Sequence, residues 1–208
     1  MKKLIQGIID FRKHRIIDYR SKFSKLALGQ TPDTLFIACS DSRVVPNLFA
    51  STDPGDLFVI RNVGNLIPPC NADGHSEGDE SEWAAVEFAT LQLNVSDIIL
   101  CGHSECGAIQ AVLEDHQKIK GEHLKSWLEY AEKASSLMSK IQFSEDLAQH
   151  NKVSQANVLL QLTHLKTYPL IQERIGTGRL KLHGWWFDIG SGNVYSFDES
   201  TGRFALIE

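Results

Sequence analysis

The chain has 208 residues, of which 42% are hydrophobic and 23% are charged, as in an ordinary globular protein. Its formal net charge of -5 leaves no surplus of positive side chains, so we expect neither a nucleic acid nor an anionic membrane as a partner. No stretch reaches the roughly 20 apolar residues of a membrane span. Charged residues interrupt the start too early for a signal peptide, so we expect a cytoplasmic protein.

The first 29 residues predict a helical arm. Between Leu4 and Leu26, apolar residues recur at roughly helical spacing among charged neighbours, which is typical of one or two amphipathic helices. The apolar side of these helices needs a covering surface. That surface is either the remainder of the same domain or a second subunit.

Three short apolar runs predict buried strands, at residues 34–38, 57–60 and 98–101. A helix predicted from about residue 80 to residue 93 leads into the third run. Strands that alternate with helices favour a mostly parallel sheet, and such sheets bind ligands beyond the carboxyl ends of their strands. Cys39, Arg61 and His103 all occupy that position. We therefore expect them to share a site.

The second half of the chain predicts helices followed by strands that form an antiparallel edge of the sheet. Residues 121–176 have a helical period, and residues 180–187 read as another strand. Two glycine-containing turns then separate two short terminal strands. The expected fold is one α/β domain over residues 1–208: a mostly parallel central sheet with flanking helices, an N-terminal helical arm (1–29) and an antiparallel C-terminal edge.

Two clusters carry residues suited to chemistry: Cys39-Ser40-Asp41-Ser42-Arg43 and His103-Ser104-Glu105-Cys106-Gly107. Each is a weak signal alone, because a cysteine after a strand is usually part of the core. Together they offer two thiolates and an imidazole, which zinc prefers, and they leave a fourth tetrahedral position without an obligatory ligand. Cys39 stands 64 residues before His103, unlike the short paired knuckles of structural zinc sites, so the spacing favours a catalytic metal.

Four motifs carry a family resemblance: Cys39-Ser40-Asp41-Ser42-Arg43, Arg61-Asn62-Val63-Gly64-Asn65, Gly102-His103-Ser104-Glu105-Cys106-Gly107 and Leu182-His183-Gly184-Trp185. With them the chain resembles the β-class carbonic anhydrases over nearly its whole length. The resemblance implies one Zn²⁺ per chain, held by Cys39, His103 and Cys106. It also implies reversible hydration of carbon dioxide to bicarbonate and a proton by zinc-bound hydroxide, with Asp41 and Arg43 as the catalytic pair that orients the metal-bound solvent.

The chemistry of the catalytic pair is consistent with that role. The Asp41 carboxylate can accept a hydrogen bond from zinc-bound water, and the planar fork of Arg43 can hold Asp41 ionised and in place. Were Arg43 to release it, Asp41 would be able to reach the metal and fill the open position. Two thiolate ligands donate more charge than imidazoles do, so we expect activity to rise with alkalinity.

The resemblance also implies residues that bind substrate. Gln30 matches an amide that donates a hydrogen bond to a substrate oxygen, while Phe58 and Val63 match positions that line a small apolar pocket. We place Gly107, directly after the last metal ligand, in the same group. Because the active site of this family forms at a dimer interface, we expect a homodimer or a homotetramer with carbon dioxide and bicarbonate as its small-molecule substrates.

Three aromatic residues depart from patterns found in the family. Some members have a noncatalytic bicarbonate site built from a Trp, an Arg and a Tyr. Here Arg61 is retained, but Phe36 and Phe187 replace the aromatic residues that carry polar groups, so we do not expect this regulatory site. Phe88 likewise stands where relatives often have a Tyr.

Two alternative functions stay open at this point. The same fold and metal ligands suit another small linear electrophile such as carbon disulfide, and access to the pocket would distinguish that reaction. A noncatalytic zinc-binding or assembly protein is the other alternative. The presence of both Asp41 and Arg43 argues against it.

Overall fold

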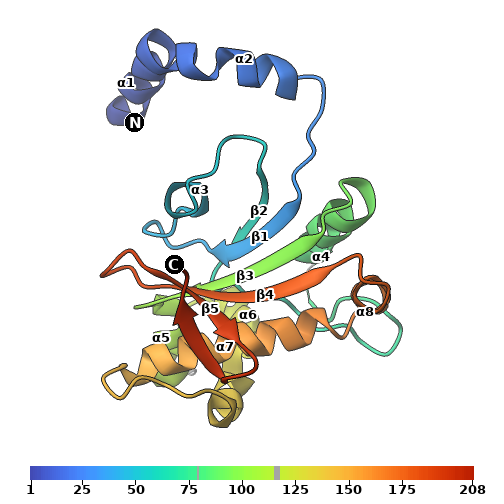
Figure 1. Cartoon of the computed structure of the whole chain (residues 1–208). Coiled ribbons are helices and arrows are strands. Elements are labelled where there is room, and N and C mark those ends of the chain that lie inside the picture. The colour runs from blue at the N-terminus through green and yellow to red at the C-terminus, as the bar shows by residue number, and fades with distance from the viewer. Residues whose placement is uncertain (79, 115–117) are drawn as a thin grey trace.

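Residues 1–78, 80–114 and 118–208 are described by the computed structural model of the chain (Figure 1). The strands are β1 Thr34–Cys39, β2 Leu57–Asn62, β3 Asp97–His103, β4 Lys181–Phe187, β5 Val194–Asp198 and β6 Arg203–Leu206. The α-helices are α1 Lys2–Asp10, α2 Ile16–Leu26, α3 Pro46–Phe49, α4 Glu80–Glu87, α5 Gly107–Glu114, α6 Glu122–Leu128, α7 Gln149–Leu165 and α8 Pro169–Gly176. The described residues also form two π-helical turns, η1 Phe11–Arg15 and η2 Phe88–Gln92, and a 3-10 helix, η4 Glu129–Lys140.

The strands form one sheet in the order β2-β1-β3-β4-β5-β6. Pairing is parallel from β2 to β4, whereas β5 and β6 add to the edge in antiparallel pairs. Strand β1 is central and buried along almost all its length, as expected for a strand covered on both faces. The predicted parallel sheet with an antiparallel C-terminal edge is confirmed.

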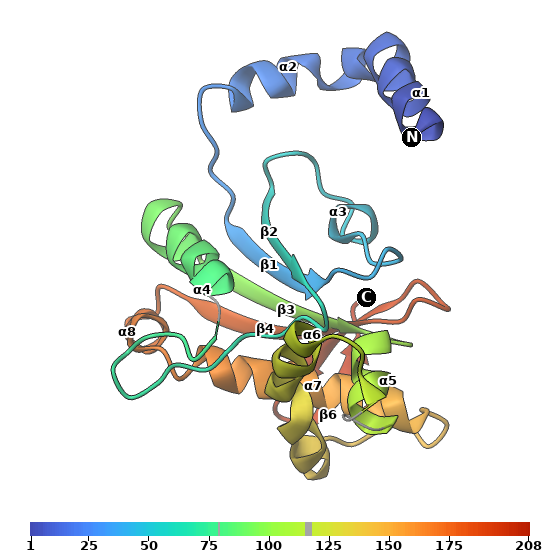
Figure 2. The ribbon, with the colours of Figure 1, turned by 180° about the vertical axis from the view of Figure 1, so that it is seen from behind.

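One face of the sheet is covered by helix α7, which runs along the strands in Figure 2, and buried residues of α4 and α8 belong to the core cluster on the same side. Leu35 and Ile37 of β1 point to this side, and helix α7 packs along β3 and β4. Glycines allow the close approach: a Cβ atom at Gly102 of β3 would lie 2.7 Å from Val158 Cγ2, and one at Gly184 of β4 would lie 3.0 Å from Val158 Cγ1. The position of α7 over the sheet therefore depends on the absence of a side chain at both Gly102 and Gly184.

The other face is packed with aromatic residues around the short helix α3. Phe36 of β1 contacts Trp185 edge-on at 5.9 Å between ring centroids, and Phe49 of α3 stacks on Phe187 at 4.5 Å. These residues alternate along the strands with those of the first face, as the pleat requires. Phe36 and Phe187 are thus part of the packed core.

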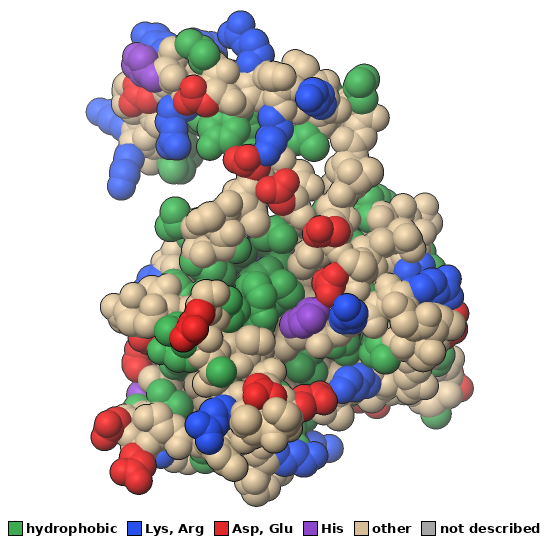
Figure 3. Space-filling model, viewed as in Figure 1, with side chains coloured by type: hydrophobic (Ala, Val, Ile, Leu, Met, Phe, Trp, Pro, Cys, Tyr) green, Lys and Arg blue, Asp and Glu red, His purple; other side chains and the backbone are tan. Residues whose placement is uncertain are grey.

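The N-terminal arm extends away from the sheet, as both ribbon views show (Figures 1 and 2). No residue of α1 or α2 is buried, and Ile17 is 70% exposed. An ion pair between Lys22 and Asp53 is one contact that links the arm to the body. On the body, hydrophobic side chains gather on the face below the arm in Figure 3, and Leu48 of α3 is 76% exposed. The arm therefore leaves its apolar side uncovered in the single chain.

Within the described residues, no helix is both long and apolar enough to cross a lipid bilayer.

Candidate active site

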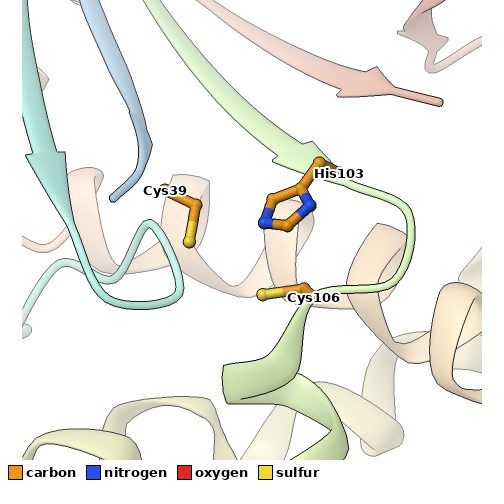
Figure 4. Close-up of side chains that lie close together, drawn as sticks. All are labelled: Cys39, His103 and Cys106. Atoms are coloured by element: carbon orange, nitrogen blue, oxygen red, sulfur yellow. The ribbon is translucent and has the colours of Figure 1, made fainter. Parts of the chain in front are cut away.

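Three potential metal ligands converge at the carboxyl edge of the parallel strands. Cys39 is the last residue of β1, His103 is the last residue of β3, and Cys106 directly precedes helix α5. Their ligand atoms all lie within 4.8 Å of one another, and all three residues are buried. In Figure 4 the side chains point toward a common centre. The structure thus brings the strand-end residues Cys39 and His103 together, and it adds Cys106 to them.

The imidazole of His103 has one nitrogen occupied and one free. Its Nδ1 lies 2.8 Å from the carbonyl oxygen of Ser104, which accepts only, so Nδ1 carries the proton and donates it. Its Nε2 is buried and has no hydrogen-bond partner among the described residues. An unpaired buried nitrogen is costly unless something satisfies it. A metal ion at this point would do so, with the tautomer already fixed by the Ser104 contact.

The two cysteines form a site that favours negative charge. Cys39 Sγ accepts the backbone N–H groups of Asp41 and Gly64, each at 3.4 Å. A hydrogen bond from the Cys106 thiol lowers the pKa of Cys39 most, with smaller contributions from His103 and these backbone groups. The same bond raises the pKa of Cys106 most, because it stabilises the protonated thiol that donates it, and burial and the nearby charge of Cys39 raise that pKa further. A divalent cation would allow both to ionise, so the donor set fits zinc.

Asp41 and Arg43 form a two-pronged ion pair beside these ligands. Arg43 Nε donates to Asp41 Oδ1 at 2.9 Å, and Arg43 Nη2 donates to Asp41 Oδ2 at 2.7 Å. These bonds, chiefly, hold the pKa of Asp41 well below its usual range. Asp41 is not one of the three grouped ligands, since its carboxylate is turned to Arg43. The carboxylate is therefore ionised, fixed and directed away from the role of a fourth ligand.

Arg61 supports the backbone that carries the first ligand and the carboxylate. Its Nε donates to the carbonyl oxygen of Cys39 at 3.0 Å, and its Nη2 donates to that of Asp41 at 2.7 Å. The sequence singled out Arg61 by its strand-end position but gave no indication of this role. Both prongs of its guanidinium are engaged with main-chain oxygens rather than with an open anion site.

Two helical residues far along the chain fix the loop after β2, and the sequence analysis missed both. Trp127 Nε1 donates to the carbonyl oxygen of Val63 at 2.7 Å, and Asn157 Nδ2 donates to that of Gly64 at 3.1 Å. These bonds hold the Gly64 N–H in the position from which it reaches Cys39. Neither residue belongs to a recognisable motif, so only the packing of the helices shows the connection.

The predicted substrate-binding residues do not all lie together. Val63 borders a cavity of about 720 Å³ that Ser40 and Asn62 also line, and Gly107 follows Cys106 at the start of α5. Gln30 precedes the amino end of β1, and Phe58 is the second residue of β2, where it stacks on Phe88. The amino ends lie opposite the metal ligands. Within one chain, Gln30 and Phe58 are therefore remote from the candidate centre.

The fold and the site define an α/β protein with a buried Cys-His-Cys centre at the carboxyl edge of its sheet, an arrangement suited to a metalloenzyme. The sequence model of the carbonic anhydrase family matches residues 34–194. The carbonic anhydrase of Pseudomonas aeruginosa is 38% identical over 207 residues, which cover 100% of this chain and 92% of that protein. The chain belongs to the β-carbonic anhydrase family, and it is an enzyme of that family.

Further relatives support the assignment over the full length. The carbonic anhydrase of Synechocystis is 42% identical over 203 residues, which cover 95% of this chain and 71% of that protein. The solved structure of the β-carbonic anhydrase CcaA superposes with a TM-score of 0.88 and 39% identity, covering 100% of this chain and 99% of the other. A tetrameric β-carbonic anhydrase of Sordaria macrospora matches with a TM-score of 0.79 and 30% identity, covering 94% and 95% of the two chains.

Proposed function

We propose that this protein catalyses the reversible hydration of carbon dioxide to bicarbonate and a proton, with one zinc ion per chain held by Cys39 Sγ, His103 Nε2 and Cys106 Sγ. The observation that carries the proposal is the buried, unpaired Nε2 of His103 facing two cysteine sulfurs. Zinc in such a site would supply Lewis acidity and so make a hydroxide nucleophile available at a lower pH than bulk water does, although the two thiolates would keep that pH higher than three imidazoles would. The remaining steps belong to the protein's own side chains.

Asp41 acts as the acceptor that orients the reacting water. Its pKa is held low by Arg43, so the carboxylate stays ionised and accepts a hydrogen bond without taking the proton permanently. Arg43 is the positioning residue, because its fork fixes the direction of both carboxylate oxygens. Val63 adds an apolar wall, which suits an uncharged gas better than an ion.

A second copy of the chain completes this proposed active site. The arm and the face around α3 expose apolar side chains that a partner would cover, as Leu48 and Ile17 illustrate. In such an assembly the partner contributes its own Gln30 and Phe58, which lie too far from the ligands of their own chain. The protein is then active as a homodimer or as a tetramer of paired dimers.

Stopped-flow measurement of carbon dioxide hydration, combined with metal analysis of the same sample, tests the proposal. We expect one equivalent of zinc per chain and hydration well above the buffer rate. A folded sample that contains no zinc, or a zinc-loaded sample that does not accelerate hydration, would refute it.

A further inference from the structure

The loop between His103 and Cys106 turns sharply at Glu105. The backbone of Glu105 has a φ of 55°, in the left-handed region that residues other than glycine rarely adopt. In this conformation its carbonyl oxygen accepts a bond from Arg43 Nη2 at 3.0 Å. Glu105 therefore joins two parts of the active site: it sets the path of the chain between two metal ligands, and it holds one nitrogen of the arginine that positions Asp41.

Asn151 forms two hydrogen bonds with Glu105, one to its main chain and one to its side chain. The backbone N–H of Glu105 donates to Asn151 Oδ1 at 2.8 Å, and Asn151 Nδ2 donates back to Glu105 Oε1 at 3.0 Å. Asn151 lies in the first turn of α7, where the helix dipole favours the carboxylate that it binds. Main chain and side chain of the same glutamate are thus fixed by one amide.

A neighbouring contact is a weaker candidate for the same role. His150 Nε2 lies 2.8 Å from Glu105 Oε1, but both side chains are partly exposed, and solvent screens such a pair. Asn151 is only 7% exposed, and its removal would leave the partly buried N–H of Glu105 without its acceptor. The amide of Asn151, not the imidazole of His150, is the contact on which the turn depends.

We propose that Asn151 is a positioning residue for carbon dioxide hydration, which acts through Glu105 to hold Cys106 in its place as a metal ligand and Arg43 in its place on Asp41. This inference rests on the proposed function of the site. Residues that orient metal ligands from outside their coordination shell commonly change metal affinity or activity about 10–100-fold when replaced.

Helix α7 provides a matched control. Gln155 lies one turn after Asn151, is 6% exposed and makes no side-chain hydrogen bond in the described part of the chain. Gln155→Ala therefore removes a buried amide of the same helix without touching the loop. We expect Gln155→Ala to keep the activity and metal retention of the parent protein.

The experiment compares the parent protein with Asn151→Ala, Asn151→Asp, Glu105→Gln, the double variant Asn151→Asp/Glu105→Gln and Gln155→Ala, all zinc-loaded. Three measurements are made: the kinetics of hydration (kcat and KM), the rate of zinc release to a chelator, and the thiolate-to-metal absorption band after exchange of zinc for Co²⁺. Asn151→Asp keeps the acceptor for the Glu105 N–H but sets a carboxylate against that of Glu105. The double variant restores a donor and an acceptor in the reverse sense.

We expect Asn151→Ala and Asn151→Asp to lower kcat/KM about 10–100-fold, mainly through kcat, to release zinc faster and to shift the cobalt band. The double variant should recover most of the loss. If Asn151→Ala does not fold, the isosteric Asn151→Asp and its rescue decide the matter. The inference is overturned if the Asn151 variants match Gln155→Ala in all three measurements, or if the double variant is no better than Asn151→Asp. A parent protein without zinc or activity would instead refute the proposed function.

Discussion

The contact between Gly102 and helix α7 gives a sharp test of how the sheet supports the site. A Cβ atom at Gly102 would lie 2.7 Å from Val158 Cγ2 and 3.3 Å from the carbonyl oxygen of Ser154. An ordinary contact between carbon atoms is about 3.5–4.0 Å, so Gly102→Ala demands a shift of roughly 1 Å. Val158 is fully buried, and Ser154 Oγ donates to the carbonyl oxygen of His103, so this shift would also disturb the segment that carries His103.

The magnitudes follow from packing. Overpacking at Gly102→Ala should destabilise the protein by about 1–3 kcal/mol. Val158→Ala removes two methyl groups from a closed core, which costs about 1.6 kcal/mol in transfer alone and about 2–3 kcal/mol with the cavity. In the double variant the added methyl group occupies part of that cavity. We therefore expect the double variant to be more stable than the sum of the single variants predicts, by about 1–2 kcal/mol.

These free energies of unfolding are measured by urea titration of the zinc-loaded protein, with circular dichroism as the probe of unfolding. The protein concentration is the same for all variants, because bound metal and subunit association change the apparent stability. Gly176→Ala is the control, because in the described part of the chain no atom beyond its chain neighbours and its own helical backbone lies within 4 Å of the position of its Cβ atom. It should leave stability close to that of the parent. Additive effects, within about 0.5 kcal/mol, or a Gly102→Ala variant as stable as the parent would refute the reasoning.

Three further predictions concern the metal, the ion pair and pH. Cys39→Ser should lose stoichiometric zinc by metal analysis; retention of a full equivalent would remove Cys39 from the ligand set. Arg43→Ala should lower kcat/KM about 10–100-fold with zinc still bound, whereas Arg179→Ala, which breaks an exposed ion pair elsewhere, should not; equal rates would contradict the positioning role. Burial lowers the pKa of His164, so the folded state resists its protonation. The free energy of unfolding should therefore fall as pH drops below about 6.5, the pKa of histidine in the unfolded chain. In a pH series, His164→Gln should show a weaker fall than the parent protein. An equal fall in both proteins would exclude His164 as the cause.

Much of the fold follows from local pattern. Short apolar runs between turn residues gave the positions of β1, β2 and β3 within a few residues, because a strand buried on both faces has few polar positions. The placement of Cys39 beside His103 followed from the same logic, since parallel strands bring their carboxyl ends to one edge, whereas Cys106 was singled out by its motif and not by a strand end. The predicted helix over residues 80–93 is found as α4 and η2, and the arm ends at Leu26 of α2.

The residues that support the site could not be predicted from the sequence pattern. Helix α7 buries the polar residues Asn151, Gln155, Asn157 and Gln161 among apolar ones, so its sequence does not distinguish a solvent face from a face aimed at the site. The hydrogen bonds of Asn151 with Glu105 and of Asn157 with Gly64 depend on where this helix crosses the sheet. The close crossing requires Gly102 and Gly184, because a Cβ atom at either position would collide with Val158 of the helix.

The pairing of β1 with β3 has a consequence for the order in which the molecule is made. Cys39 and His103 are separated by 64 positions, and their strands become neighbours only after that long segment has closed on itself. Zinc fingers, by contrast, gather their metal locally and fold around it. With the zinc ligands proposed for this chain, most of the fold would form before the metal binds, so the supply of zinc would govern how many folded molecules become active rather than how many fold.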